Sequence, residues 1–225
     1  SWSRLLDRLA RAEPEAGGRA LFGDEGSVRW TAIWQSAALL SSAAALRELA
    51  PEGRARWALA GGRLREGLVD RLGPAPWTAA PGRAVDGSAA AMLAACWLGV
   101  VDVDHPGAVM TARRLRQTCW HGGGVLLHGG AHVAATALLS GVLSRLEPTV
   151  DPVGTVALLA ASTGALPTAR HPWRGVVGEG DDSLSSALFV LLVLDRVRVL
   201  RGRVVILPGL ERAQDLPTPY GRIAV

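Results

Sequence analysis

Two hydroxyl side chains, a glycine and two basic side chains lie close together in the second half of the chain. They are Ser162, Thr163, Gly164, Arg170 and His171. Hydroxyl groups and a glycine N–H can surround a phosphate, and a nearby guanidinium or imidazolium can balance its charge. These five residues are the candidate nucleotide-binding residues, with ATP or AMP as the ligand to expect. Because turns commonly use Ser, Thr and Gly, an ordinary strand-to-loop turn is the alternative.

A second group of residues that could do chemistry is His128-Gly129-Gly130. A strand followed by His-Gly-Gly resembles the oxyanion loop of esterase-type hydrolases, in which backbone N–H groups stabilise a developing negative charge. A small α/β hydrolase with Ser162 or Ser183 as its nucleophile is therefore one alternative. The chain contains no G-x-S-x-G sequence, which that family places at its nucleophile.

The histidines do not form a metal-binding pattern. His128 and His132 are four positions apart, but Gly129 and Gly130 make a continuous helix between them improbable, and no H-E-x-x-H sequence is present. Cys96 and Cys119 lie in apolar or amphipathic segments, where buried free thiols are expected. We predict no metal site, and we assign no catalytic residue.

Composition excludes several classes of protein. Hydrophobic residues make up 49% of the 225, which is too many for a disordered chain. The net charge is only +4 and the arginines are mixed with acids, so a nucleic-acid partner is not expected. All 24 basic residues counted as Lys or Arg are arginines, so no amine is available for Schiff-base or acyl-activating chemistry.

The sequence also indicates where the protein works. No basic segment followed by an apolar core stands at the start, and the longest apolar run, 187–194, is far shorter than the ~20 residues that cross a bilayer. These features predict a cytoplasmic protein without a membrane partner.

The elements that position these residues follow from apolar periodicity. Helical spacing predicts helices over 2–12, 31–46, 62–72, 89–98, 111–120, 131–146 and 183–196. Short apolar runs predict strands over 19–22, 27–30, 56–60, 100–103, 125–127, 155–161 and 203–207. The first two strands would form a hairpin, and Asp182 or Ser183 would cap the last helix.

Alternation of strands and helices predicts an α/β fold with a mostly parallel, helix-flanked sheet. Ligands bind beyond the carboxyl ends of strands in such sheets, which is where the turn at Ser162 would lie. We expect a single domain over 1–225, or two lobes divided near the Pro-rich loop at 73–82.

Three segments, taken in order, resemble the N-terminal part of adenylate-forming enzymes. That superfamily includes acyl- and aryl-CoA ligases, peptide-synthetase adenylation domains and luciferases. Residues 26–46 resemble its first strand pair and helix, 89–106 its alanine-rich helix and following strand, and 156–170 its nucleotide loop T-S-G-S-T-G-x-P-K. The resemblance implies a fold like the N-terminal subdomain of those enzymes and a nucleotide or acyl group as ligand.

The chain departs from that family in ways that remove its chemistry. Ala160-Ala161 replace the start of the loop, Leu166 is an insertion, and Arg170 stands where the loop lysine belongs. Complete members continue for hundreds of residues, whereas about 50 follow the loop here. The resemblance therefore implies a truncated relative that is noncatalytic or depends on a partner from a ligase or carrier-protein system. A structural or interaction subunit, docking through tryptophans and the apolar segment 184–194, is the remaining alternative.

Overall fold

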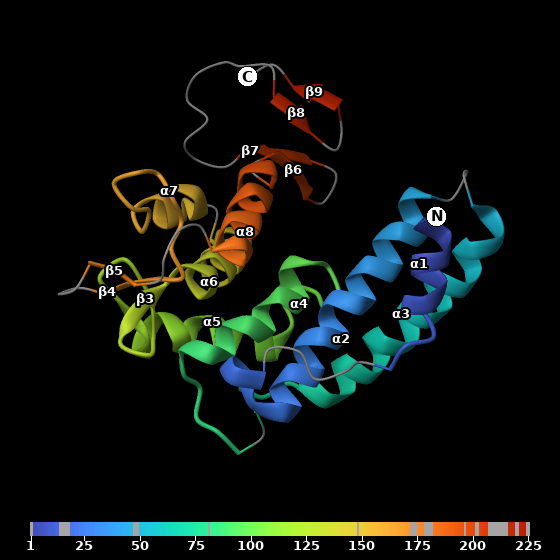
Figure 1. Cartoon of the computed structure of the whole chain (residues 1–225), viewed down its shortest axis with the longest axis horizontal. Coiled ribbons are helices and arrows are strands. Elements are labelled where there is room, and N and C mark those ends of the chain that lie inside the picture. Colours follow the sequence, from blue (N-terminus) through green and yellow to red (C-terminus); the bar gives the residue numbers. More distant parts are fainter. Residues whose placement is uncertain are drawn as a thin grey trace. The chain divides into compact units, whose positions relative to one another are not determined.

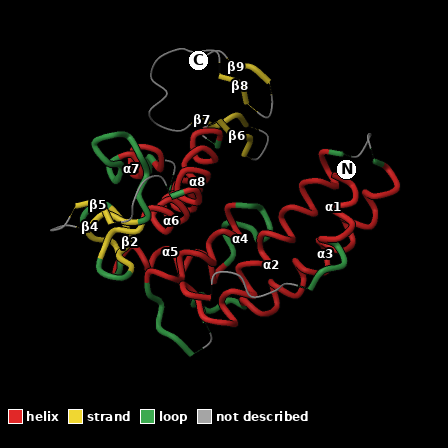
Figure 2. Tube along the Cα trace, in the orientation of Figure 1, coloured by secondary structure: helices red, strands yellow, loops and turns green. Residues whose placement is uncertain are grey.

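The computed structural model has a mixed α/β fold in which helices predominate (Figures 1 and 2). The residues that it describes are 2–13, 19–46, 50–80, 82–147, 149–171, 175–177, 182–195, 197–200, 203–206, 216–218 and 221–223. The chain divides into two compact units, Ser1–Arg114 and Leu115–Val225. The Pro-rich loop at 73–82, where the sequence suggests a division, lies inside the first unit.

The first unit is helical. Its elements are α1 (Trp2–Leu9), α2 (Arg19–Ala45), α3 (Pro51–Leu72), the 3-10 helix η1 (Gly87–Leu93), α4 (Ala94–Trp97) and most of α5 (Pro106–Thr118). The two long helices α2 and α3 lie side by side as a hairpin (Figure 1). Their facing sides carry buried residues at intervals of three, four or seven, as packed helices require. These are Ala32, Ser36, Leu39 and Ala43 on α2, and Trp57, Gly61, Leu68 and Leu72 on α3.

The helices α2 and α3 approach closely at Gly61. A Cβ atom at this glycine would lie 2.9 Å from Cγ of Leu40 and 3.1 Å from Cβ of Leu39. The Ser36 hydroxyl donates a hydrogen bond to the Gly61 carbonyl at 2.9 Å, in the buried contact between the helices. Gly61 therefore sets the spacing of the hairpin.

Four strands predicted in this unit are wrong. The hairpin expected at 19–22 and 27–30 is the first half of α2, and the strand expected at 56–60 lies inside α3. Pro51 occupies the start of α3, where its missing N–H costs nothing, and the helix then continues through an Ala-, Leu- and Arg-rich sequence. Residues 100–103 form an irregular segment with bends and the start of a turn, after Gly99, whose φ of +71° ends the preceding helix.

The second unit contains a small antiparallel sheet. Its strands are β1 (Trp120–His121), β2 (Gly124–Leu127), β3 (Gly130–His132), β4 (Ala169–His171) and β5 (Gly175–Val177), paired in that order. Two separate hairpins follow, formed by β6 (Val197–Leu200) with β7 (Arg203–Ile206) and by β8 (Leu216–Thr218) with β9 (Gly221–Ile223). Every pair of described strands is antiparallel, so the α/β content is confirmed and the mostly parallel sheet is wrong.

The described part of the second unit also contains the helices α6 (Val133–Leu146), α7 (Pro152–Ala157) and α8 (Ser183–Leu194). Twelve consecutive residues of α6, from Val133 to Ser144, are buried, and this helix contacts α7, α8 and β2. The buried strand expected at 155–161 is wrong, because its first half is the end of α7 and its second half is a turn. The helix expected at 183–196 is confirmed as α8, with Asp182 as its N-cap.

Candidate functional site

The Ser162 turn follows α7 and is exposed. The N–H of Gly164 donates to the Ala161 carbonyl at 2.9 Å, and the N–H of Ala161 donates to the Ala165 carbonyl at 2.8 Å. The N–H of Ala165 is 3.5 Å from the Thr163 hydroxyl oxygen. The turn therefore uses the Gly164 N–H for its own closure, and the exposed Ser162 and Thr163 side chains stand at its tip.

The two basic residues of the predicted nucleotide site lie on β4. The Arg170 guanidinium donates a hydrogen bond to the Leu158 carbonyl at 2.7 Å, which brings this strand to the segment that precedes the Ser162 turn. His171 is the next residue of the strand and is half-buried. Nucleotide binding by Ser162, Thr163, Gly164, Arg170 and His171 stays a prediction, which calorimetric titration with ATP and AMP would test.

The glycine-rich segment that resembles an oxyanion loop forms two tight hairpin turns. Gly122 and Gly123 link β1 to β2 with φ values of +59° and +87°. His128 and Gly129 link β2 to β3 with φ values of +52° and +83°. Two-residue hairpins of type I′ need positive φ at both central positions, which explains the glycines without any catalytic role.

His132 is buried at the junction of β3 and α6. Its Nδ1 accepts a hydrogen bond from the Ala135 N–H at 3.3 Å, so the side chain caps α6 and must be neutral to do so. Burial lowers the pKa of His132, the nearby Asp182 carboxylate partly opposes this change, and His128 adds to it. Among the described residues, no cluster of three His, Cys, Asp or Glu side chains could hold a metal ion.

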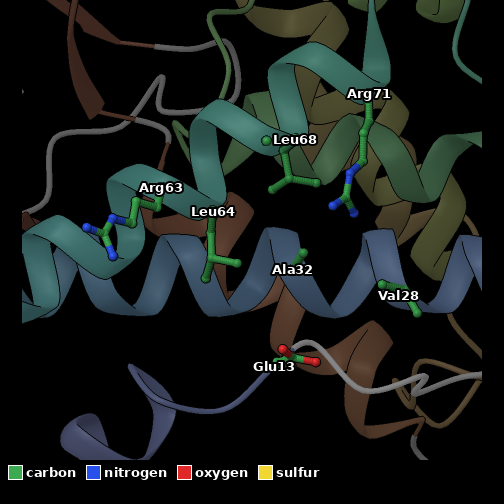
Figure 3. A pocket seen from close by; sticks show the side chains of 8 residues that line it. Glu13, Val28, Ala32, Arg63, Leu64, Leu68 and Arg71 are labelled. Carbon is green, nitrogen blue, oxygen red and sulfur yellow. The ribbon is translucent and has the colours of Figure 1, made fainter.

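A hollow that the sequence did not predict lies between the two long helices. We call it the α2/α3 hollow; its volume is about 380 Å³. Its lining residues are Val28 and Ala32 of α2, Arg63, Leu64, Gly67, Leu68 and Arg71 of α3, and Glu13 beyond the end of α1. Figure 3 shows Leu64 and Leu68 between the two arginines along α3, with Ala32 and Val28 on the facing helix.

The helix α1 packs against the same pair of helices, nearer to their connection. Leu6 is buried in a cluster with Leu39, Ala43 and Trp57. Next to it, the Asp7 carboxylate pairs with Arg56 at 3.1 Å and accepts a hydrogen bond from Nε1 of Trp57 at 2.9 Å. An amphipathic helix is thus already held along one part of the hairpin by a leucine and a carboxylate.

Gln35 marks where α1 ends and the hollow begins. Its side-chain amide donates to the carbonyls of Leu9 and Ala12, both at 2.7 Å. On α2 it lies between Leu39, which α1 covers, and Ala32, which lines the hollow. Beyond Gln35, the facing sides of α2 and α3 therefore continue past the helix that covers their first part.

The two arginines of the hollow differ from Arg56 in forming no ion pair with a described residue. Arg56 pairs with Asp7, whereas Arg63 and Arg71 are exposed and form no hydrogen bond or ion pair with any residue that the structure describes. Glu13 contributes one carboxylate to the lining, and it too is unpaired within the described residues. Among its described lining residues, the hollow therefore combines an apolar floor with two guanidiniums and one carboxylate.

Comparison with protein-family models, curated proteins and solved structures gave no match to this chain. The resemblance to adenylate-forming enzymes consequently rests on the sequence motifs alone. In the described part of the chain, every helix is too short or too polar to span a membrane.

Proposed function

We propose that this protein is a noncatalytic interaction subunit whose helical unit receives a helix of a partner protein in the α2/α3 hollow. The observation that carries this proposal is that α1 covers one part of the α2/α3 hairpin and ends near Gln35, and that no other described helix covers the hollow beyond it. The chain thus supplies its own example of a helix bound to this surface.

The energetics of the hollow support the same function. Covering apolar surface stabilises a complex by roughly 25 cal/mol for each Å² removed from water. Leu64 is half-buried and Val28 is half-buried, so both retain area that a partner could cover. Leu68 and Ala32 form a preformed floor, since both are buried already. A partner helix would therefore find an already packed floor and gain contacts along its apolar side.

This function agrees with the partner-dependent role that the sequence predicts and needs no catalytic group. Kinship with adenylate-forming ligases would add an acyl- or carrier-protein system as the setting. That addition is a separate proposal, because binding at the hollow does not depend on the Ser162 turn.

Selection from a peptide library tests the function directly. The immobilised full chain is presented with a library of helical peptides of unrestricted charge, and the bound peptides are assayed again on two variants. Gly67→Trp fills the hollow, because Gly67 lines it and nothing lies within 4 Å of a Cβ atom there. Gly62→Trp is the matched control, since Gly62 lies on the same helix with equal space around it but does not line the hollow.

We expect selected peptides to bind the full chain and the Gly62→Trp variant and to lose at least tenfold in affinity for Gly67→Trp. Circular dichroism of both variants verifies that the hairpin is intact. A selection that yields no peptide sensitive to Gly67→Trp contradicts the proposed function.

A further inference from the structure

We infer that the helix received by the α2/α3 hollow is acidic, with two carboxylate side chains about two helical turns apart on either side of its apolar residues. This inference rests on the proposed function and specifies the chemistry of the partner.

The covered part of the hairpin shows how an α3 arginine is used. There α1 places Leu6 against the apolar cluster, and the adjacent Asp7 carboxylate reaches the Arg56 guanidinium and the Trp57 indole N–H. A leucine followed by an acid is thus the pattern that this surface already holds. The hollow repeats the same ingredients. Leu68 and Leu64, which also packs against the cluster around Leu6, provide apolar contacts, and Arg63 and Arg71 provide guanidinium groups.

The spacing of the two arginines sets the spacing of the acids. Arg63 and Arg71 are eight positions apart on one helix. At 1.5 Å per residue their backbones are about 12 Å apart along α3. A partner helix that runs along α3 would match both guanidiniums with Asp or Glu seven or eight positions apart. Apolar residues between the two acids would then meet Leu64 and Leu68, which lie between the two arginines on α3.

The charges around the hollow favour an acidic occupant over a basic one. Arg63 and Arg71 face it from α3, and among the described lining residues Glu13 is the only acid. Glu66 and Asp70 are exposed neighbours on α3 but are not part of the lining. A basic helix would meet two uncompensated guanidiniums. Individual exposed ion pairs are weak, so the preference comes from both arginines acting on one ligand.

A small amphipathic anion, such as a fatty-acid carboxylate, shares part of this chemistry. Its single carboxylate can meet one guanidinium and leaves the other without a partner. The continuity of the hollow with the surface that α1 covers also favours a helix. The structure therefore assigns the hollow to an acidic helix, and a small anion becomes an outcome of the test.

Two designed peptides test the inference on the full chain. Both are stapled helices of about 16 residues with leucines at the same positions, and they differ only in carrying two Glu or two Lys eight positions apart. Affinities are measured by fluorescence anisotropy at low salt, with dodecanoate as a competitor. The variants are Arg63→Glu combined with Arg71→Glu, and Arg65→Glu as a control on the same helix but outside the lining.

We expect the Glu peptide to bind at least tenfold more tightly than the Lys peptide. The double variant should reverse this order, and Arg65→Glu should leave it unchanged. Equal affinities for the two peptides, or an equal effect of Arg65→Glu and the double variant, overturns the inference. Binding of dodecanoate without either peptide assigns the hollow to a small anion and also overturns it. If the library peptides that lose affinity for Gly67→Trp prove neutral or basic, the proposed function stands and the acidic partner is wrong.

Discussion

At the scale of single residues, the contact between α2 and α3 depends on the absence of a side chain at Gly61. Gly61→Leu would place atoms where Leu39 and Leu40 already lie, and we expect it to reduce the free energy of unfolding by about 1–3 kcal/mol. Gly62→Ala adds a methyl group into open space on the same helix and should instead stabilise it by about 0.5–1 kcal/mol. Urea unfolding followed by circular dichroism measures both changes. Equal effects of the two substitutions would mean that the helices are not in close contact at Gly61.

A second residue-scale prediction concerns pH. Burial lowers the pKa of His132 below its ordinary value of about 6.5, so the unfolded chain takes up this proton at a higher pH than the folded chain. The stabilisation that depends on neutral His132 is complete above pH 6.5 and is lost as the pH falls through the window down to the folded pKa.

His132→Asn keeps a capping side chain but removes the titration. We expect this variant to lose less unfolding free energy between pH 7 and pH 5 than the natural chain does. His121→Asn, at an exposed position on β1, is the control and should keep the full acid-side loss. Parallel pH profiles for His132→Asn and the natural chain would contradict the prediction.

At the scale of elements, helix capping determines the structure of segments whose sequence patterns suit both a helix and a strand. Short apolar runs suit a buried strand and a buried helix equally well. The apolar run after Pro152 forms a helix because of Asp151. Its carboxylate accepts hydrogen bonds from the N–H groups of Val153 and Gly154, which starts α7. An Asp-Pro pair is typical of a helix start. Here it outweighs the β-branched residues, which favour a strand. Where apolar spacing was unambiguous, as in α1 and α5, the predicted helices are confirmed.

The α2/α3 hollow could be predicted from the sequence only in part. Leu64 and Leu68 lie between Arg63 and Arg71 along one helix, a pattern that indicates an apolar side with a basic residue at each end. Whether that side is covered depends on where α1 stops, and the Gln35 hydrogen bonds determine this from 26 and 23 positions away in the sequence. Such long-range contacts leave no local pattern, so the sequence predicts a site at the nucleotide turn and does not predict the hollow.

At the scale of the whole molecule, the second unit leaves an apolar surface exposed on α8. This helix has no charged residue, and its Val190 is 56% and its Leu194 46% exposed, while Leu188 and Leu192 are buried. Exposed apolar surface of this kind lowers solubility, because contact between molecules removes it from water. A polar substitution on the exposed side of α8 should therefore raise the solubility of the whole chain without changing its free energy of unfolding.

Val190→Lys tests this separation of solubility from stability. Lysine there would place its charge in solvent, near the helix C-terminus where a cation is favourable. We expect the variant to stay in solution at higher protein concentration, with the free energy of unfolding changed by no more than about 0.5 kcal/mol. Leu192→Lys, two positions away but only 1% exposed, should unfold the second unit because it buries an unpaired charge. Sedimentation after concentration and urea unfolding distinguish the two variants. If Val190→Lys destabilises the chain as much as Leu192→Lys does, then Val190 is packed in the folded protein and α8 contributes no exposed face.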